Sequence, residues 1–272
     1  MAGGPRSFRQ LCLQTADASI RVSRELCSYC TFSRRVLRAA AAAVVRPRRI
    51  RWKSVAAYMD SCGSDAMPII ALLGLLIGVI LAFQAIVQLD RFGGRDFVAN
   101  LLGPVIVTEL APLVTAVVLA GRTGSSFAAE LGSMKADEEL DALFTCGFDL
   151  NDFLLLPKLF ALLLVMPGLT IIADCCGIVG GMLIVCNMIG VSVAEYMGKT
   201  FEAIQPIDLA QGIVKSFLFA LIVSTVGCMK GLNAERDAQG VGRSATSAVV
   251  TSIFLIVVAD AVMTALFSSV GR

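Results

Sequence analysis

The chain has 272 residues, of which 57% are hydrophobic and only 16% are charged. Soluble domains carry about 25% charged residues, so this composition excludes an ordinary soluble fold. There is no histidine, which excludes Ser-His-Asp triads, His-ligated metals and histidine proton relays. We therefore expect an integral membrane protein with no metal site, and we expect no nucleic-acid partner.

The amino-terminal segment, residues 1–65, is basic, with twelve Lys and Arg against four Asp and Glu. The positive-inside rule predicts that this segment is cytoplasmic. A basic stretch around Trp52, just before the first span, is typical of an interfacial helix; the alternative is a solvated basic tail. Because residues 1–45 are Arg-rich and acid-poor, an organellar transit peptide is a further alternative.

The nine cysteines predict no disulfide framework. Cys27 and Cys30 form one CxxC pair, but a zinc site needs a second ligand pair at suitable spacing. We expect inert thiols in a reducing compartment.

Long apolar runs predict five transmembrane helices in an all-α fold, because a bilayer core needs about 20 apolar residues per helix. A membrane-embedded domain at 66–268 follows the basic segment. The stretch 153–190 fits one kinked helix or two tight spans, and the positive-inside rule favours one span with an extension outside. The predicted spans are 66–89, 97–120, 153–190, 209–229 and 245–267, with the carboxyl end outside.

Small residues predict close helix packing at two places. The first span carries Gly74 and Gly78 in a GxxxG pattern, which lets helix backbones approach each other. A second small-residue surface lies where residues 121–152 become polar enough to leave the bilayer, and it includes Gly121, Gly124 and Gly132. Pro104 and Pro112 predict kinks in the second span.

A short amphipathic helix is predicted after the second span, on the cytoplasmic side. Asp137 is a good N-cap, and the first turn is acidic. An apolar face follows at i, i+3, i+4 spacing, and Gly147 suits the end of the helix. The helix either covers the base of the protein or is pushed by a partner. Its defining residues are Asp137, Glu138, Glu139, Leu140, Asp141, Leu143 and Phe144.

Four ionisable residues at bilayer depth stand out: Glu109, Asp174, Lys215 and Asp260. Such groups are costly in a bilayer and usually functional. Lys215 and Asp260 lie at matching depths, about 10 Å from the outer end by helical rise, so we predict that they form an ion pair. Glu109 is expected at a central cavity, or as an uncharged cap for backbone freed by Pro112.

Three further charged residues have open interpretations. Asp174 is expected near the outer end of its span, where it is solvated or part of the lipid pathway. Arg243 enters the last span from the cytoplasmic face, where it binds lipid headgroups or anchors the helix. Arg122 either holds the base of the second span or pairs with Glu130.

Four consecutive motifs resemble those of MlaE-type (YrbE-like) ABC permeases. They are Glu-Leu-x-Pro at 109–112, Ala-Gly-Arg-x-Gly-Ser at 120–125, Ala-Glu-Leu-Gly-x-Met at 129–134 and Glu-Glu-Leu-Asp-Ala-Leu at 138–143. The resemblance covers about residues 52–267, with supporting motifs at 88–93, 156–158 and 240–243. One departure is Thr108, where members of the family often carry Arg.

The resemblance implies a homodimeric permease whose ATP is hydrolysed by a separate ABC ATPase subunit docked under residues 124–146, Glu130 included. It also implies a periplasmic Mce-type lipid-binding protein, and phospholipid or a related lipid moved between the inner and outer membranes. The membrane would then be the bacterial inner membrane. The chain itself would be non-catalytic and bind no cofactor, with ATP and Mg used by the partner; consistently, it contains no G-x-x-x-x-G-K-[ST] phosphate loop.

Two other classes of protein are weighed against this interpretation. A self-contained ion-coupled transporter would use Glu109 and Asp260 to carry protons, but five spans do not divide into two equal repeats. A membrane scaffold that transports nothing leaves the intramembrane charges without a role.

Overall fold

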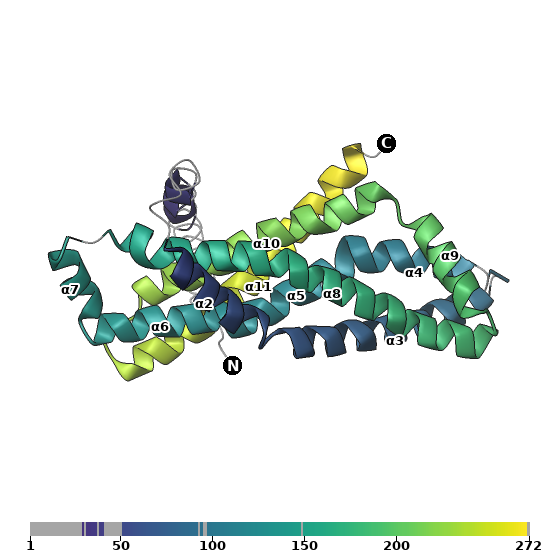
Figure 1. Cartoon of the computed structure of the whole chain (residues 1–272), viewed down its shortest axis with the longest axis horizontal. Coiled ribbons are helices and arrows are strands. Elements are labelled where there is room, and N and C mark those ends of the chain that lie inside the picture. Colours follow the sequence, from purple (N-terminus) through teal and green to yellow (C-terminus); the bar gives the residue numbers. More distant parts are fainter. Residues whose placement is uncertain are drawn as a thin grey trace, which may run out of the picture.

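The computed structural model describes residues 29, 31–36, 38–40, 51–91, 93–94, 97–147 and 149–270. These described residues form helices joined by short turns, without a β-strand among them (Figure 1). The predicted all-α fold is therefore confirmed. Cys27 and Cys30 lie outside the described residues, and the six cysteines within them are free thiols.

Within the described part of the chain, five helical stretches are long and apolar enough to cross a membrane, which confirms the predicted number. The third is a single helix, α8 (Leu156–Ile189), preceded by the π turn η5 (Asn151–Leu155), so the one-span interpretation of 153–190 is confirmed. The other spans are α3 (Met67–Asp90), the composite helix Val98–Ala136, α10 (Pro206–Leu232) and α11 (Ala238–Val270).

The composite helix of the second span is longer than predicted, because it stays helical to Ala136 and does not end at residue 120. It consists of five segments: α4 (Val98–Val105), η3 (Ile106–Leu110), α5 (Ala111–Leu119), η4 (Ala120–Gly124) and α6 (Ser125–Ala136). Segments η3 and η4 are π turns, and η3 lies just before Pro112, whose missing N–H leaves a carbonyl one turn earlier without its α-helical partner.

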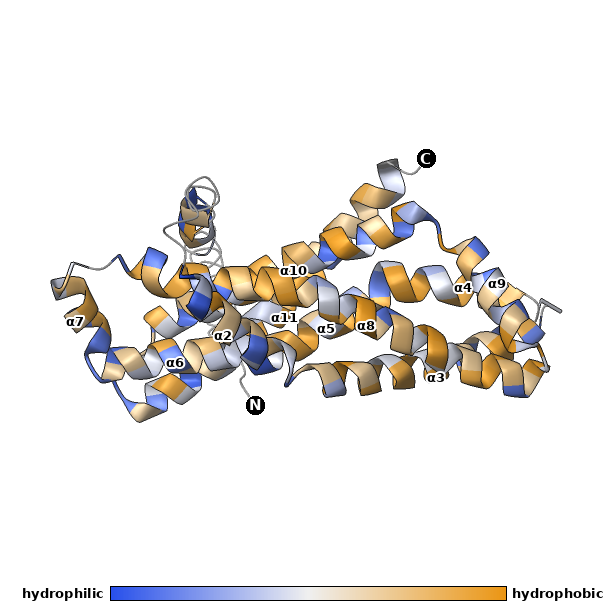
Figure 2. Ribbon diagram, in the orientation of Figure 1, coloured by the Kyte–Doolittle hydropathy of each residue, from blue (hydrophilic) through white to orange (hydrophobic). Residues whose placement is uncertain are grey.

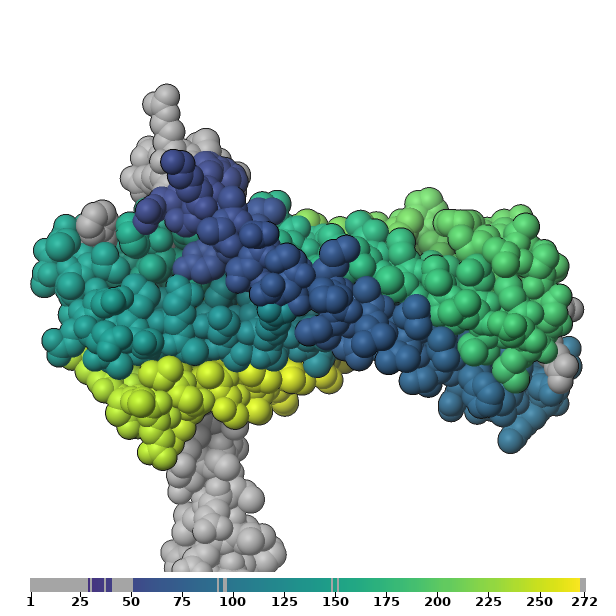
Figure 3. Space-filling model, turned by 60° about the horizontal axis from the view of Figure 1, so that its bottom comes forward, coloured from purple at the N-terminus to yellow at the C-terminus, as the bar shows by residue number. Residues whose placement is uncertain are grey.

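The long helices lie along one axis, with short helices at both ends (Figure 1). At one end α7 (Glu139–Thr145) joins α6 to η5, and at the other α9 (Val193–Ala203) packs on α4 and α8. Helix α2 (Trp52–Gly63) is the predicted helix before the first span, and it lies across the bundle against α8 (Figure 3). We call these the α7 end and the α9 end.

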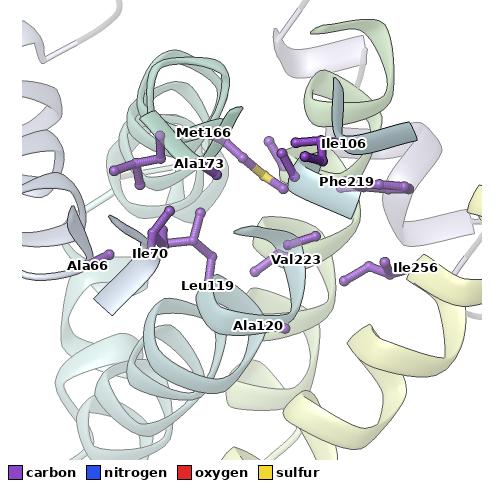
Figure 4. Close-up of a cluster of buried hydrophobic side chains, with 14 of the residues drawn as sticks. Ala66, Ile70, Ile106, Leu119, Ala120, Met166, Ala173, Phe219, Val223 and Ile256 are labelled. Atoms are coloured by element: carbon purple, nitrogen blue, oxygen red, sulfur yellow. The ribbon is translucent and has the colours of Figure 1, made fainter. Parts of the chain in front are cut away.

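The described residues form two hydrophobic cores. The larger lies among the spans, where Met166, Leu119, Val223 and Ile256 converge (Figure 4). The smaller lies at the α7 end and includes Leu140, Leu156 and Val55, together with Val36 and Ala40 from the described part of the basic segment. The basic segment is thus partly packed against the bundle.

Close packing explains most of the predicted glycines. A Cβ on Gly74 would lie 2.8 Å from the carbonyl oxygen of Ala173, and one on Gly78 would overlap the carbonyl of Gly177, which confirms the close approach of α3 to α8. Gly124 and Gly132 also contact side chains of neighbouring elements. The prediction for Gly121 is wrong, because a Cβ there would meet nothing within 4 Å.

The bundle is apolar along its length, with most hydrophilic residues towards its ends (Figure 2). Burial is uneven among the spans: 72% of the most apolar window of α10 is buried but only 11% of that of α11. Helix α10 is therefore the central helix, whereas α11 lies at the edge and presents apolar side chains outward.

Candidate functional site

An ion-pair network lies among three spans, and its centre is Lys215 of α10. The Lys215 ammonium donates to Glu109 Oε2 at 2.5 Å and to the Thr264 hydroxyl at 2.9 Å, and lies 2.9 Å from Asp260 Oδ1. The Thr264 hydroxyl in turn donates to Glu109 Oε1 at 3.0 Å. We call these four residues the Lys215 cluster.

The predicted ion pair between Lys215 and Asp260 is confirmed. The sequence did not indicate that Glu109 belongs to the same cluster, and the alternative of an uncharged cap for the backbone near Pro112 is wrong, because its carboxylate meets Lys215. The structure places the two residues at similar depths on helices that contact each other. Glu109 is eleven residues into its span and Lys215 nine into α10, and a π turn rises less per residue than an α turn.

The Lys215 cluster has an excess of negative charge, with two carboxylates around one ammonium. The Lys215 side chain is fully buried, while the side chains of Asp260 and Glu109 are 17% and 30% exposed. A buried lysine needs a paired carboxylate, and one is sufficient for neutrality. Glu109 is therefore the second carboxylate, and it is the more exposed of the two.

Asp174 lies apart from this cluster, and its predicted position near the outer end of its span is wrong. Helix α8 begins at Leu156 and continues to Ile189, which places Asp174 in the middle. It is only 8% exposed, and its Oδ1 has no hydrogen-bond partner among the described residues.

A second buried lysine, Lys158 of α8, lies at the α7 end and pairs with Glu130 of α6. Its ammonium lies 4.6 Å from the centre of the Tyr58 ring and 4.9 Å from that of Phe127. The Tyr58 hydroxyl donates to Glu130 Oε1 at 2.7 Å. Burial, and then this bond to the carboxylate, raise the pKa of Tyr58 well above its usual value. We call these four residues the Lys158 cluster.

The Lys158 cluster corrects one predicted contact. Arg122 does not pair with Glu130, because Lys158 and Tyr58 occupy that carboxylate. Arg122 instead pairs with Asp65 at 2.6 Å, between the start of α3 and η4. Arg122 thus holds the base of the second span, which was the other interpretation.

Helix α7 is present where an amphipathic helix was predicted, but its start differs. Asp137 is not the N-cap of α7: α6 continues to Ala136, so Asp137 terminates α6, and the left-handed Glu138 (φ 60°) turns the chain into α7. Gly147, with φ 80°, follows α7 as predicted.

The buried face of α7 contains fewer residues than predicted. Leu140 is buried and Leu143 half-buried, but Phe144 is 72% exposed and does not join them. The carboxylates of Glu138, Glu139 and Asp141 are on exposed residues. The result is an acidic helix with one large aromatic ring in solvent, which is the composition of a contact surface.

Arg236, in the turn between α10 and α11, holds α7 against the bundle. Its guanidinium lies 2.8 Å from Asp141 Oδ2 and 3.7 Å from Glu138 Oε1. Nearby, Arg243 is exposed and lies 3.6 Å from Glu235. A cavity of about 320 Å³ lies between the end of α10 and the start of α11. Its lining includes Lys230, Asn233, Glu235, Arg243, Ser244 and Ser247.

Five apolar spans, a buried charge cluster between them and a short exposed helix at one end define a multi-span membrane protein of the permease class. Sequence comparison agrees: the family profile described as Permease MlaE matches residues 55–266. The chain belongs to the MlaE permease family.

Several relatives carry names of the same class. A probable ABC transporter permease protein of Rickettsia bellii is 32% identical over 252 residues, covering 93% of this chain and 95% of that protein. The probable ABC transporter permease protein slr1045 of Synechocystis is 32% identical, covering 78% and 81%. The chloroplastic protein TRIGALACTOSYLDIACYLGLYCEROL 1 of Arabidopsis thaliana is 32% identical, covering 80% of this chain and 63% of that one.

Proposed function

We propose that this chain is the membrane subunit of an ATP-driven ABC transporter that moves phospholipid or a related lipid between the inner and outer membranes. It acts as a homodimer, with ATP hydrolysed by a separate ATPase subunit and a periplasmic Mce-type lipid-binding protein on the opposite side. The observation that carries the proposal is α7, an acidic helix with Phe144 exposed at the end of an otherwise apolar bundle. An ABC ATPase is the partner that a permease of this class requires at such a surface.

The α7 end is assigned to the cytoplasm, where ATP is available. The basic segment packs at this end, and its exposed residues include Arg34, Arg35, Arg38, Arg51 and Lys53. This distribution supports the assignment by the positive-inside rule. The amino terminus is then cytoplasmic, and the membrane is proposed to be the bacterial inner membrane.

Force reaches the Lys215 cluster along one continuous helix. Helix α7 is joined directly to α6, and α6 continues through η4 and α5 to η3, which contains Glu109. Movement of α7 by the ATPase therefore displaces a helix that carries one member of the cluster. We propose that the cluster lies on the lipid pathway, where Glu109 supplies a polar contact between apolar walls.

A lipid cargo suits the apolar character of the spans, and the name of the Arabidopsis relative contains a galactolipid. Arg243 is proposed to contact lipid headgroups at the cytoplasmic surface, beside the cavity between α10 and α11. Asp174 lies in the middle of α8, and its Oδ1 has no hydrogen-bond partner among the described residues, so we propose it as a further polar residue on the pathway.

The test is co-purification with a candidate ATPase, followed by ATP-dependent lipid transfer in proteoliposomes. Glu139→Lys reverses an exposed charge on α7, and Glu195→Lys makes the same change on α9 as a control. We expect Glu139→Lys to release the ATPase and abolish transfer, and Glu195→Lys to leave the ATPase bound. Equal ATPase binding by the wild type and Glu139→Lys, or no ATPase with the wild type, would overturn the proposal.

A further inference from the structure

Three glycines of α10 lie against backbone carbonyls of the second span. A Cβ on Gly212 would overlap the carbonyl of Val107, one on Gly227 would lie 2.7 Å from the carbonyl oxygen of Gly124, and one on Gly231 would lie 2.8 Å from that of Ala128. Both helices run from the α9 end to the α7 end. These three contacts therefore fix the axial register between two parallel helices.

The contacting residues are spaced differently along the two helices. Seventeen residues separate Val107 from Gly124, but only fifteen separate Gly212 from Gly227. Beyond Gly124 the count is equal, because four residues lead to the next contact on each helix. The second span therefore contains two extra residues, all of them between the first two contacts.

The two π turns account for this difference. Segments η3 and η4 lie at the two ends of the interval, and a π turn is a single-turn bulge that accommodates one additional residue in an α-helix. One extra residue is absorbed at each turn. Helix α5 thus lies between two bulges, each fixed to α10 by a glycine contact.

The same arrangement determines where Glu109 points. Glu109 belongs to η3, and Lys215 lies three residues after Gly212, on the same side of α10. If Glu109 moves away, Lys215 keeps Asp260 and Thr264 as partners, and Glu109 is already 30% exposed. Breaking this one contact therefore does not leave a buried ammonium without a carboxylate.

We propose that Gly212 and Gly227 are positioning residues of a register device, in which α5 shifts against α10 and makes or breaks the contact between Glu109 and Lys215. Displacement of α6 alters the π turn at η4, α5 moves as a unit, and η3 adjusts in compensation. This inference rests on the proposed function in one respect, that the ATPase displaces α6 through α7. The coupling between η4 and η3 is a property of the chain alone.

The first test is a set of double mutants in the complete transporter, reconstituted with its ATPase and fluorescent phosphatidylethanolamine. Gly212→Ala and Gly227→Ala are each combined with Glu109→Gln, and Gly168→Ala in α8, where a Cβ meets nothing within 4 Å, is the control. We expect each glycine variant to lower transfer at least tenfold alone, but to add nothing to Glu109→Gln. Effects that multiply, or a Gly227→Ala transporter with wild-type transfer, would overturn the device.

The second test uses hydrogen–deuterium exchange on the permease alone, without ATP, so it remains informative if transport itself is not observed. Gly227→Ala is expected to change amide exchange at 120–124 and also at 106–110, while 113–118 is unchanged. A change confined to 120–124 would show that the two turns are independent. Absence of ATP-dependent transfer by the wild type would count against the proposed function instead.

Discussion

The two buried lysines of this protein have the same exposure but different surroundings. Lys158, at the α7 end, has one carboxylate partner and the faces of two aromatic rings. Lys215, among the spans, has two carboxylates and a hydroxyl. The Lys158 cluster is therefore neutral and joins α2, α6 and α8, whereas the Lys215 cluster carries one negative charge in excess.

We propose that this difference separates a structural ion pair from a functional one. A neutral pair between two helices fixes their relative positions, and losing its one carboxylate would leave the buried lysine without a counter-ion. A cluster with a second carboxylate can lose one ion pair while its lysine keeps the other. Its contacts can therefore change during a transport cycle. The predictions that follow test whether the two clusters respond as differently as their composition implies.

The largest expected effect is that of Lys215→Ala, which leaves Glu109 and Asp260 as unpaired carboxylates among the spans. Removing one partner of a buried pair costs about 3–5 kcal/mol, and here two anions also face each other. Unfolding in detergent would measure the loss, with Lys199→Ala, whose side chain is 31% exposed, as the control.

Adding Asp260→Ala to Lys215→Ala should restore part of that stability, since only Glu109 then remains unpaired. Strictly additive costs in this double-mutant cycle would show that the two side chains do not interact.

Lys158→Ala should be costly but less so, at about 2 kcal/mol, because the Glu130 side chain is 37% exposed and can be hydrated. Its effect should be local, loosening α2 from α6 and α8. Limited proteolysis near α2, together with thermal unfolding, would detect this. A loss equal to that of Lys215→Ala would remove the distinction between the clusters.

Phe144→Ala should weaken binding of the ATPase about tenfold, since exposed aromatic residues dominate such interfaces. The same change should alter the permease's own stability by less than about 0.5 kcal/mol. Titration of the purified ATPase would measure the affinity, with Phe201→Ala on α9 as the matched exposed control. Equal affinities of the two variants would show that α7 is not the contact surface.

The smallest effect is expected for Arg236→Ala, because its ion pairs with Asp141 and Glu138 are exposed. Such pairs contribute about 0.2–1 kcal/mol and are screened by salt. The difference in stability between the wild type and the variant should therefore be larger at low salt than at high salt. A salt-independent loss would place Arg236 with the buried lysines instead.

The sequence predicted the features that depend on composition and helical period. The number of spans, the single third span, the ion pair of Lys215 and Asp260, and the close approach at Gly74 and Gly78 follow from apolar length, depth and residue size. The longer second span was missed because residues after Gly121 are polar on average, although the face towards α10 is small and buried.

Other features depend on which helices are neighbours, and one chain's pattern does not reveal this. Glu109 and Lys158 each have partners more than 25 residues away, and no local spacing indicates those pairs. Asp137 is a residue type typical of an N-cap. In the structure α6 extends to Ala136, so Asp137 caps the carboxyl end of α6 and does not begin α7. The π turns could not be predicted either, because they accommodate two extra residues relative to α10, and the sequence does not show that α10 is the neighbouring helix.

The most direct test compares Glu109→Gln with Tyr58→Phe for ATP-dependent lipid transfer in proteoliposomes, per folded transporter. We predict that Glu109→Gln unfolds close to the wild-type temperature but transfers lipid at least tenfold more slowly. Tyr58→Phe removes the hydrogen bond to Glu130 in the Lys158 cluster, so it should unfold about 3 °C lower and transfer at the wild-type rate. Wild-type transfer by Glu109→Gln would contradict the assignment of the Lys215 cluster to transport.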